Sequence, residues 1–211
     1  MKKKLIVLAA SMVLISVVTG LASVIRPESP EGKGILLSVL NIMNAAIAIA
    51  AMKLTDMKLD LDIKNKKQYL IGFCIAYDLT IAVAVLPALC GFSLVGGHRE
   101  FSKLALIFYF FFYMFIVGPA EELIFRVYLQ DTLVSAVKKH KWIGVVLAAM
   151  IFGAWHMING SVIQALFTFG IGMVFGMCRY RIKSCKFIGL AMAHGLYDFL
   201  IVLVTMFIVQ N

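Results

Sequence analysis

The sequence predicts an all-α protein, a polytopic bundle of about seven transmembrane helices. The 211-residue chain is 62% hydrophobic and only 15% charged, whereas soluble domains average about 45–50% apolar and about 25% charged residues. Its mean hydropathy is +0.96. Apolar runs of roughly 18–25 residues recur along the chain, and each is long enough to cross about 30 Å of hydrocarbon. Together these observations predict an integral membrane protein that is surrounded by a lipid bilayer.

Seven apolar runs define the predicted spans. They cover residues 5–25, 34–52, 69–90, 104–137, 142–158, 161–178 and 187–208. The fourth run is too long for a single crossing. Gly118-Pro119 within it offers a place for a kink or a restart, because proline removes a backbone donor and clashes with the preceding turn. We treat residues 1–211 as one membrane domain, in which residues 1–103 supply N-terminal helices without an assigned role and residues 104–208 carry the motifs described below.

The distribution of basic residues predicts the orientation of the bundle. The net charge of +9 comes from short basic clusters between the apolar runs, not from a basic face interleaved with aromatic residues. This pattern indicates membrane topology and argues against a nucleic-acid partner. Fifteen of the 20 Lys and Arg residues fall on one side of the predicted bundle. By the positive-inside rule, we expect a cell-membrane protein with a cytoplasmic N-terminus and a C-terminus outside.

The first 23 residues have two interpretations. Three lysines, an apolar stretch and the small residues around Gly20 resemble a cleaved secretory signal. The apolar stretch extends to Ile25, which makes it long enough to span the membrane. We therefore favour an uncleaved membrane anchor.

The first of three short motifs places charged residues inside a predicted span. Residues 118–126 contain Glu121, Glu122 and Arg126. An unpaired carboxylate or guanidinium at the bilayer centre costs about 2.5–3.5 kcal/mol on insertion scales. Residues four apart share a helix face, so Glu122 and Arg126 can form an ion pair, whereas Glu121 is rotated by about 100°. We therefore expect one structural carboxylate and one that is free for chemistry.

The other two motifs supply two histidines and a third carboxylate. His156 follows Phe152 by four residues, and Asn159 lies three residues further on. His194 and Asp198 share a helix face, so Asp198 can accept a hydrogen bond from an imidazole and fix its tautomer. Two histidines and one or two carboxylates from three helices are the usual ingredients of a site that holds an activated water or a metal.

Each motif alone also has a plain structural interpretation. A buried histidine often only packs and hydrogen-bonds, and a Glu–Arg pair can lock two helices or line a transport path. The ordered set of three motifs is far harder to explain in this way. The spans hold three further polar residues without an assigned partner, Asn41, Asn44 and Asp78, and lining the same cavity is one role open to them.

The two histidines pose a question of depth. At about 1.5 Å per residue, His194 lies roughly 10 Å from the cytoplasmic end of its predicted helix, whereas His156 lies nearer the far end of its own. The histidines meet at one depth only if the span that holds His156 begins outside the hydrocarbon or tilts strongly.

The three motifs resemble, in order, spacing and helical context, those of the CAAX-protease and bacteriocin-processing (CPBP or Abi) family of intramembrane proteases. In this chain they read Glu121-Glu122-x-x-x-Arg126, Phe152-x-x-x-His156 and His194-x-x-x-Asp198. The resemblance implies a polytopic bundle whose cavity admits a peptide, and hydrolysis of a peptide bond within or beside the membrane. Prenylated CAAX tails, bacteriocin leaders and membrane-protein segments are the substrate classes that it implies. For this chain we expect a peptide or membrane-protein substrate.

The resemblance also implies roles for individual residues. By position, Glu121 would activate water with the assistance of His156, while His194 and Asp198 would stabilise the oxyanion or complete the site. Glu122 and Arg126 would support these residues, and we add Asn159 as a further supporting residue. Either a divalent metal such as zinc, held by Glu121, His156 and His194, or a metal-free glutamate could activate the water. The zinc-protease signature H-E-x-x-H does not occur in this sequence.

An intramembrane endopeptidase is therefore the leading function. A bacteriocin-immunity protein or membrane scaffold that keeps the fold without proteolysis is a second candidate, although three complete motifs argue against it. A small transporter that relays protons through the buried charges is a third. Transporters often contain internal repeats, and this sequence shows none.

Overall fold

The computed structural model describes residues 1–25, 27–28, 30–158 and 160–209. The regular secondary structure of these residues is entirely helical, which confirms the all-α prediction. Six of their helices are long and apolar enough to cross a membrane, and one shorter apolar helix accompanies them. The elements are α1 (Lys2–Val24), α2 (Pro30–Leu54), α3 (Lys66–Thr80), η1 (Ile81–Val85), α4 (Leu86–Leu89), α5 (Lys103–Phe112), η2 (Tyr113–Val117), α6 (Gly118–Glu122), η3 (Leu123–Gln130), α7 (Asp131–Ala136), α8 (Trp142–Trp155), η4 (His156–Ile158), α9 (Val162–Arg181) and α10 (Phe187–Phe207).

A continuous 34-residue helical run, Lys103–Ala136, contains the elements α5 to α7. The sequence offered Gly118-Pro119 as a break, but the helix continues through it. The π-helical segment η2 ends directly before Gly118. Because π-helical hydrogen bonds run from residue i to i+5, the N–H that proline lacks falls where the α-helical register is already interrupted. A second π-helical segment, η3, follows the double glutamate.

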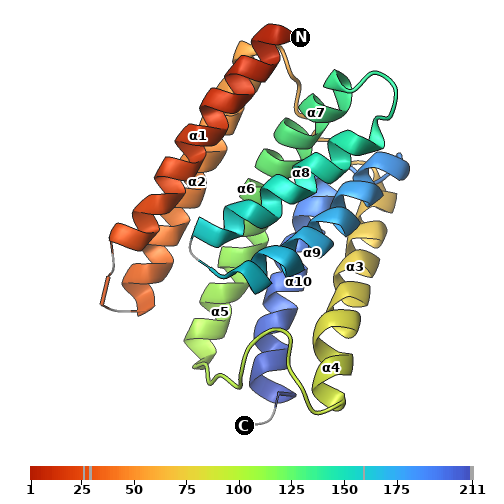
Figure 1. Cartoon of the computed structure of the whole chain (residues 1–211). Coiled ribbons are helices and arrows are strands. Elements are labelled where there is room, and N and C mark those ends of the chain that lie inside the picture. The colour runs from red at the N-terminus through yellow and green to blue at the C-terminus, as the bar shows by residue number, and fades with distance from the viewer. Residues whose placement is uncertain (26, 29, 159, 210–211) are drawn as a thin grey trace.

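Three helix pairs surround this central run (Figure 1). They are α1 with α2, α8 with α9, and α3 with α10. Helix α10 also packs along α6 and η2. The N-terminus and the end of α10 lie at opposite ends of the bundle, at the top and the bottom of Figure 1. This arrangement places the helix that carries the third motif directly against the helix that carries the first.

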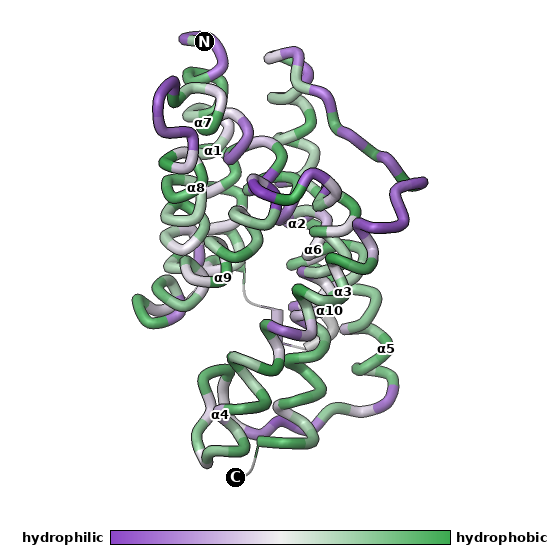
Figure 2. The backbone as a smooth tube through the Cα atoms, turned by 90° about the vertical axis from the view of Figure 1, so that its right-hand side faces the viewer, coloured by the Kyte–Doolittle hydropathy of each residue, from purple (hydrophilic) through white to green (hydrophobic). Residues whose placement is uncertain are grey.

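Two apolar cores hold the helices together. One joins α1 and α2 to η3 and α8, and the other joins α3, α9 and α10. Other large apolar side chains point outward, among them Leu104, Ile163 and Phe207, which are 76%, 80% and 70% exposed. Figure 2 shows hydrophobic residues along the helices and hydrophilic residues in several connections. This outward apolar surface is the one that contacts lipid.

Helices α8 and α9 cross the bundle obliquely. Both views show that α8 ends, and α9 begins, well short of the lower ends of α4, α5 and α10 (Figures 1 and 2). The 14 residues of α8 span about 21 Å, which is less than the thickness of about 30 Å of the hydrocarbon core. His156, the first residue after α8, therefore lies at an intermediate depth. The strong tilt of this hairpin is what allows the two histidines to approach each other.

Candidate active site

Two glycines let α10 pack backbone against backbone on η2 and α6. A Cβ atom at Gly118 would lie 2.6 Å from the Ala191 carbonyl oxygen, and one at Gly195 would lie 2.5 Å from the Tyr113 carbonyl oxygen. Real Cβ atoms essentially never approach other atoms this closely. The absence of a side chain at both positions therefore brings the glutamates of α6 against His194 of α10.

His194 lies among three carboxylates. Its Nδ1–H donates a hydrogen bond to Oε1 of Glu122 (2.8 Å). Its Nε2 lies 3.6 Å from Oε2 of Glu121 and 3.6 Å from Oδ2 of Asp198. The Glu122 side chain is 0% exposed and that of Asp198 is 22% exposed. The site is thus closed to solvent at Glu122 and partly exposed to solvent at Asp198.

Glu122 also contacts Arg126, as their spacing predicts. The Nε atom of Arg126 lies 3.5 Å from Oε2 of Glu122, and both side chains are fully buried. The guanidinium carbon lies 4.6 Å from the centre of the Phe152 ring, which is a cation–π arrangement. Glu122 therefore connects the guanidinium to His194 and orients that imidazole. We expected this role of Asp198 from the sequence, but Asp198 faces the other ring nitrogen.

His156 is linked to the site by the aromatic ring of Phe152, which contacts both histidines. Its Nδ1–H donates to the Phe152 carbonyl oxygen (2.9 Å), which leaves Nε2 as the available nitrogen. The centre of the Phe152 ring lies 4.6 Å from that of His156 and 6.2 Å from that of His194. The two histidines thus contact one aromatic ring, while His156 forms no ion pair with the carboxylates of the described residues.

Several buried polar atoms of the site have no hydrogen-bond partner among the described residues. They are Oε2 of Glu121, Oε2 of Glu122, the three guanidinium nitrogens of Arg126 and the indole Nε1 of Trp155. Buried polar groups are nearly always paired with protein or water, and an unpaired one costs about 1–3 kcal/mol. These atoms are therefore suited to bind water or the polar groups of a ligand.

Aromatic residues surround the site, and one of them, Phe175, lies outside the three motifs. The ring of Phe175 stacks on His194 at 5.3 Å between centres. Phe125 packs against Phe152 and Trp155, at 4.9 and 5.1 Å between centres. Nothing in the local sequence distinguishes Phe175 from the other phenylalanines of this chain. Only the packing of α9 against α10 identifies it.

The structure brings most of the predicted residues together. Five lie in contact within one cluster, namely Glu121, Glu122, Arg126, His194 and Asp198. His156 lies one ring away, and Asn159 is outside the described residues.

The other polar residues of the spans have different surroundings. Asn44 donates to the hydroxyl of Thr19 (2.9 Å) and links α2 to α1. Asn41 donates to the carbonyl oxygen of Leu37 in its own helix (2.9 Å). Asp78 is exposed on the outside of α3. Its position does not agree with a role in lining the site.

The three residues named as metal ligands do not converge. In the described part of the chain, no group of three or more His, Cys, Asp or Glu side chains is arranged to hold a metal ion. Glu121 and His194 are close to each other, whereas among the described residues His156 forms no ion pair with either glutamate and contacts the ring of Phe152. This donor arrangement does not fit a three-ligand metal site, so the steps derived below use the side chains of the protein alone.

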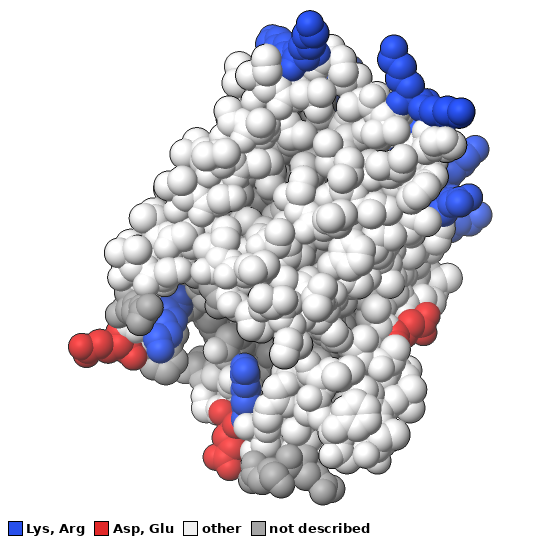
Figure 3. Space-filling view, viewed as in Figure 1, with Lys and Arg blue, Asp and Glu red and all other residues white. Residues whose placement is uncertain are grey.

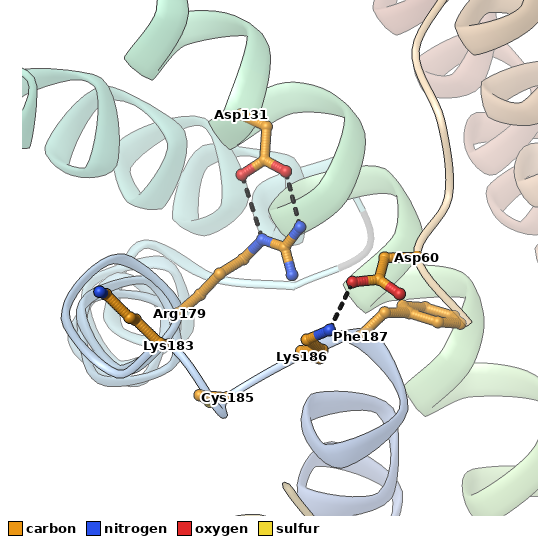
Figure 4. Close-up of a pocket in the computed structure, with 7 residues that line it drawn as sticks. All are labelled: Asp60, Asp131, Arg179, Lys183, Cys185, Lys186 and Phe187. Carbon is orange, nitrogen blue, oxygen red and sulfur yellow. Dashed lines mark hydrogen bonds and ion pairs between the residues drawn. The ribbon is translucent and has the colours of Figure 1, made fainter. Parts of the chain in front are cut away.

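A second polar cluster lies at the end of the bundle that holds the N-terminus, where Figure 3 shows most of the visible basic side chains. We call it the basic-end cluster, and it consists of Asp60, Asp62, Asp131, Arg179 and Lys186. Arg179 binds both carboxylate oxygens of Asp131, at 3.1 and 2.6 Å. Lys186 contacts Asp60 at 2.8 Å and Asp62 at 3.1 Å. Four of these residues line a surface pocket (Figure 4).

The hydrogen bond between Lys186 and Asp60 lowers the pKa of the Asp60 carboxyl and raises the pKa of the Lys186 ammonium. Both shifts favour the charged forms. The basic-end cluster therefore fastens the connection between α2 and α3 to the start of α10, and fastens α7 to α9. It contains none of the residues of the three motifs.

The comparison with known proteins agrees with the motif analysis. Residues 103–200 match the family model described as "Type II CAAX prenyl endopeptidase Rce1-like". No protein of curated function and no solved structure matches the chain. The matched segment holds all three motifs, and the helices that contain it form a transmembrane bundle. Over these residues, the chain is similar to the CAAX-protease family, which supports a protease-type hydrolase, and its apolar helices support a multi-pass membrane protein.

Proposed function

We propose that this protein is an intramembrane endopeptidase that hydrolyses a peptide bond with a water molecule activated by Glu121. The position of His194 carries this proposal. Its Nδ1 is fixed by Glu122, and its Nε2 lies 3.6 Å from both Glu121 and Asp198. A water molecule and a peptide carbonyl next to these atoms would meet a proton acceptor and a proton donor together.

Glu121 acts as the general base in this proposal. Its Oε2 atom is buried and has no hydrogen-bond partner among the described residues, so it is able to accept one from water. As the water oxygen bonds to the carbonyl carbon, Glu121 takes one proton. It then delivers this proton to the amide nitrogen as the C–N bond breaks, so that one carboxylate serves both proton transfers.

His194 stabilises the negative charge that develops on the carbonyl oxygen. In its protonated form it presents Nε2–H, while Nδ1–H remains bound to Glu122. Donors that are held in place before the reaction stabilise an oxyanion without reorganisation. Asp198 lies beside Nε2 and supports the positive charge of the imidazolium. The free Nε2 of His156 is the second group that accepts a hydrogen bond from the water.

The substrate reaches the site from the hollow that Figure 3 shows below the α8–α9 hairpin, between the α1–α2 pair and α5. Among the three carboxylates around His194, Asp198 is the most exposed, so the substrate would enter on the side of this carboxylate. A peptide segment held in or at the bilayer fits this route. The basic end faces the cytoplasm, since it carries most Lys and Arg residues.

A comparison of new protein N-termini tests the proposed function. Membranes from cells that express the wild-type protein or Glu121→Gln, at equal levels, are analysed for termini that only the wild type generates. Glu100→Gln is the matched control, because Glu100 is an exposed glutamate outside the cluster. We expect the set of termini to be lost in Glu121→Gln and kept in Glu100→Gln.

Identical sets of termini in all three membranes would reject proteolysis by this site. If a wild-type phenotype then also persisted in Glu121→Gln, the immunity or scaffold function would replace it. Addition of a chelator to the purified wild-type protein tests the metal independently. Loss of cleavage that only a divalent cation restores would assign a metal to the reaction.

A further inference from the structure

Asp78 is an acidic residue on the lipid-facing side of the bundle. It is exposed on α3, and the uncharged side chains Phe73, Tyr77 and Ile81 around it are exposed as well. It is the only acidic residue in the sequence of α3. Figure 3 shows one acidic patch over α3, at mid-height on the right-hand edge, within an otherwise uncharged surface.

The depth of Asp78 makes this exposure unusual. The span that contains it is Lys66–Leu89, so Asp78 lies about 18 Å from one end and about 16 Å from the other at about 1.5 Å per residue. It is therefore near the centre of the hydrocarbon. Ionisable residues in transmembrane segments almost always face the interior of a bundle or a water-filled cavity and pair with other groups.

The rest of the described chain supplies no such partner. No hydrogen bond or ion pair joins Asp78 to another described residue, and the basic residues at comparable depth are Arg126, His156 and His194, which belong to the site. The other described Lys and Arg residues lie at helix ends or in connections. The described residues of a second copy of this chain would therefore also present no free cation at this depth.

An apolar groove adjoins Asp78. It runs between η1 and the second half of α10, and Tyr77, Thr80 and Ile81 from the Asp78 region form one of its walls. The opposite wall comes from α10, through Leu200, Leu203, Val204 and Phe207. The face thus combines a groove for apolar side chains with one carboxylate at its edge.

We propose that this face binds a transmembrane helix of another protein, with a basic side chain of that helix paired to Asp78. Apolar side chains of the partner fill the groove, and its Lys or Arg residue supplies the positive charge that the described residues do not offer to Asp78. Polar contacts between transmembrane helices contribute modestly but specifically. This docking surface lies on the outside of α3 and does not depend on the proposed peptidase activity.

Disulfide cross-linking to designed peptides tests the proposal. Cys74 is exposed one turn before Asp78, on the same face of α3, and serves as the natural reporter. Two transmembrane peptides of about 23 residues carry either Lys or Leu at the centre, with a cysteine one turn to either side. Each is reconstituted with the full-length protein in lipid vesicles, and mass spectrometry locates the cross-links. Circular dichroism of oriented bilayers verifies that both peptides span the membrane.

We expect the Lys peptide to cross-link to Cys74 about tenfold more than the Leu peptide, in keeping with the strength of polar contacts in membranes. The preference should disappear in Asp78→Leu and persist in Asp78→Glu, which retains the charge. Equal cross-linking of the two peptides, or a Lys preference that survives Asp78→Leu, would overturn the proposal. Cross-linking of Cys74 between two copies of the protein, dependent on Asp78, would overturn it in favour of a self-association surface.

Discussion

The interior cluster around His194 and the basic-end cluster use the same chemistry in opposite ways. Both pair carboxylates with basic side chains. At the basic end, Arg179 binds both oxygens of Asp131, and the Asp131 side chain is 41% exposed. In the interior, Arg126 and Glu122 are fully buried, yet their closest approach is 3.5 Å. The exposed pair, which water could solvate, thus has short and well-aligned hydrogen bonds. The buried pair, which water reaches poorly, has a longer contact and polar atoms without a hydrogen-bond partner in the described part of the chain.

This difference separates groups that hold the fold together from groups that are available to a ligand. An exposed ion pair contributes about 0–1 kcal/mol, because water solvates its partners well when they separate. A buried charge has no such alternative and depends on every partner it has. Among the described residues, Oε2 of Glu121 and the nitrogens of Arg126 have no hydrogen-bond partner, which reduces stability. We infer that these atoms are retained because water or substrate forms hydrogen bonds with them.

The largest effect should follow removal of the base. Glu121→Gln should lower the rate of peptide hydrolysis about 10³-fold, within the range known for general acid–base catalysis, because the amide cannot accept the proton of water. Single-turnover cleavage by purified protein measures this. The unfolding transition in SDS should stay close to that of the wild type, since Glu121 is not in the ion pair with Arg126. Full activity of the variant would show that the interior cluster is structural, like the basic-end cluster.

Breaking the buried ion pair should mainly affect stability. Glu122→Leu leaves Arg126 buried without its carboxylate, which should cost about 3–5 kcal/mol of unfolding free energy. The double variant Glu122→Leu/Arg126→Met removes both charges and should recover most of this loss. It should not recover hydrolysis, because His194 has also lost its orienting acceptor. Equal stability of the single and double variants, measured by SDS unfolding, would contradict the dependence of Arg126 on Glu122.

A methyl group between η2 and α10 should have an intermediate effect. Gly195→Ala places a Cβ atom 2.5 Å from the Tyr113 carbonyl oxygen, and such overpacking typically costs about 1–3 kcal/mol. Gly170→Ala is the control, because a Cβ atom there meets no atom within 4 Å. Activity of Gly195→Ala should fall together with stability, since the displaced helix carries His194. If both variants behave like the wild type, the close approach of these helices is not required.

The smallest effect should come from the basic-end cluster. Asp131→Asn weakens the pair with Arg179, whose side chain is 17% exposed, and should cost no more than about 1 kcal/mol. Hydrolysis should be unchanged. The difference from the wild type should shrink further at high salt, because ions screen exposed charges. A loss as large as that of Glu122→Leu would remove the distinction between the two clusters.

The positions of the spans were predictable from the sequence because each needs only a long apolar run. The predicted span at 187–208 corresponds to α10, Phe187–Phe207. The contact between Glu122 and Arg126 was predictable for a similar reason, since residues four apart share a helix face. Such local rules act within one helix. They identified the residues of the candidate site without giving its geometry.

Contacts between helices were the part that local rules missed. The hydrogen bond from His194 to Glu122 joins residues 72 positions apart, and it depends on the close approach at Gly118 and Gly195. We therefore assigned the orienting role to Asp198, which lies on the same helix as His194. The sequence also did not predict that Asp78 points outward, because the direction of its side chain depends on which side of α3 packs against α10.

The shortness of α8 has a consequence for the surrounding lipid. A helix that covers about 21 Å cannot match a hydrocarbon layer of about 30 Å, so the acyl chains next to its end must bend or the leaflet must become thinner. This mismatch carries a modest energetic cost that grows with membrane thickness. The protein should consequently be favoured in thinner membranes. A substrate would have its backbone partly hydrated beside this helix before it reaches Glu121.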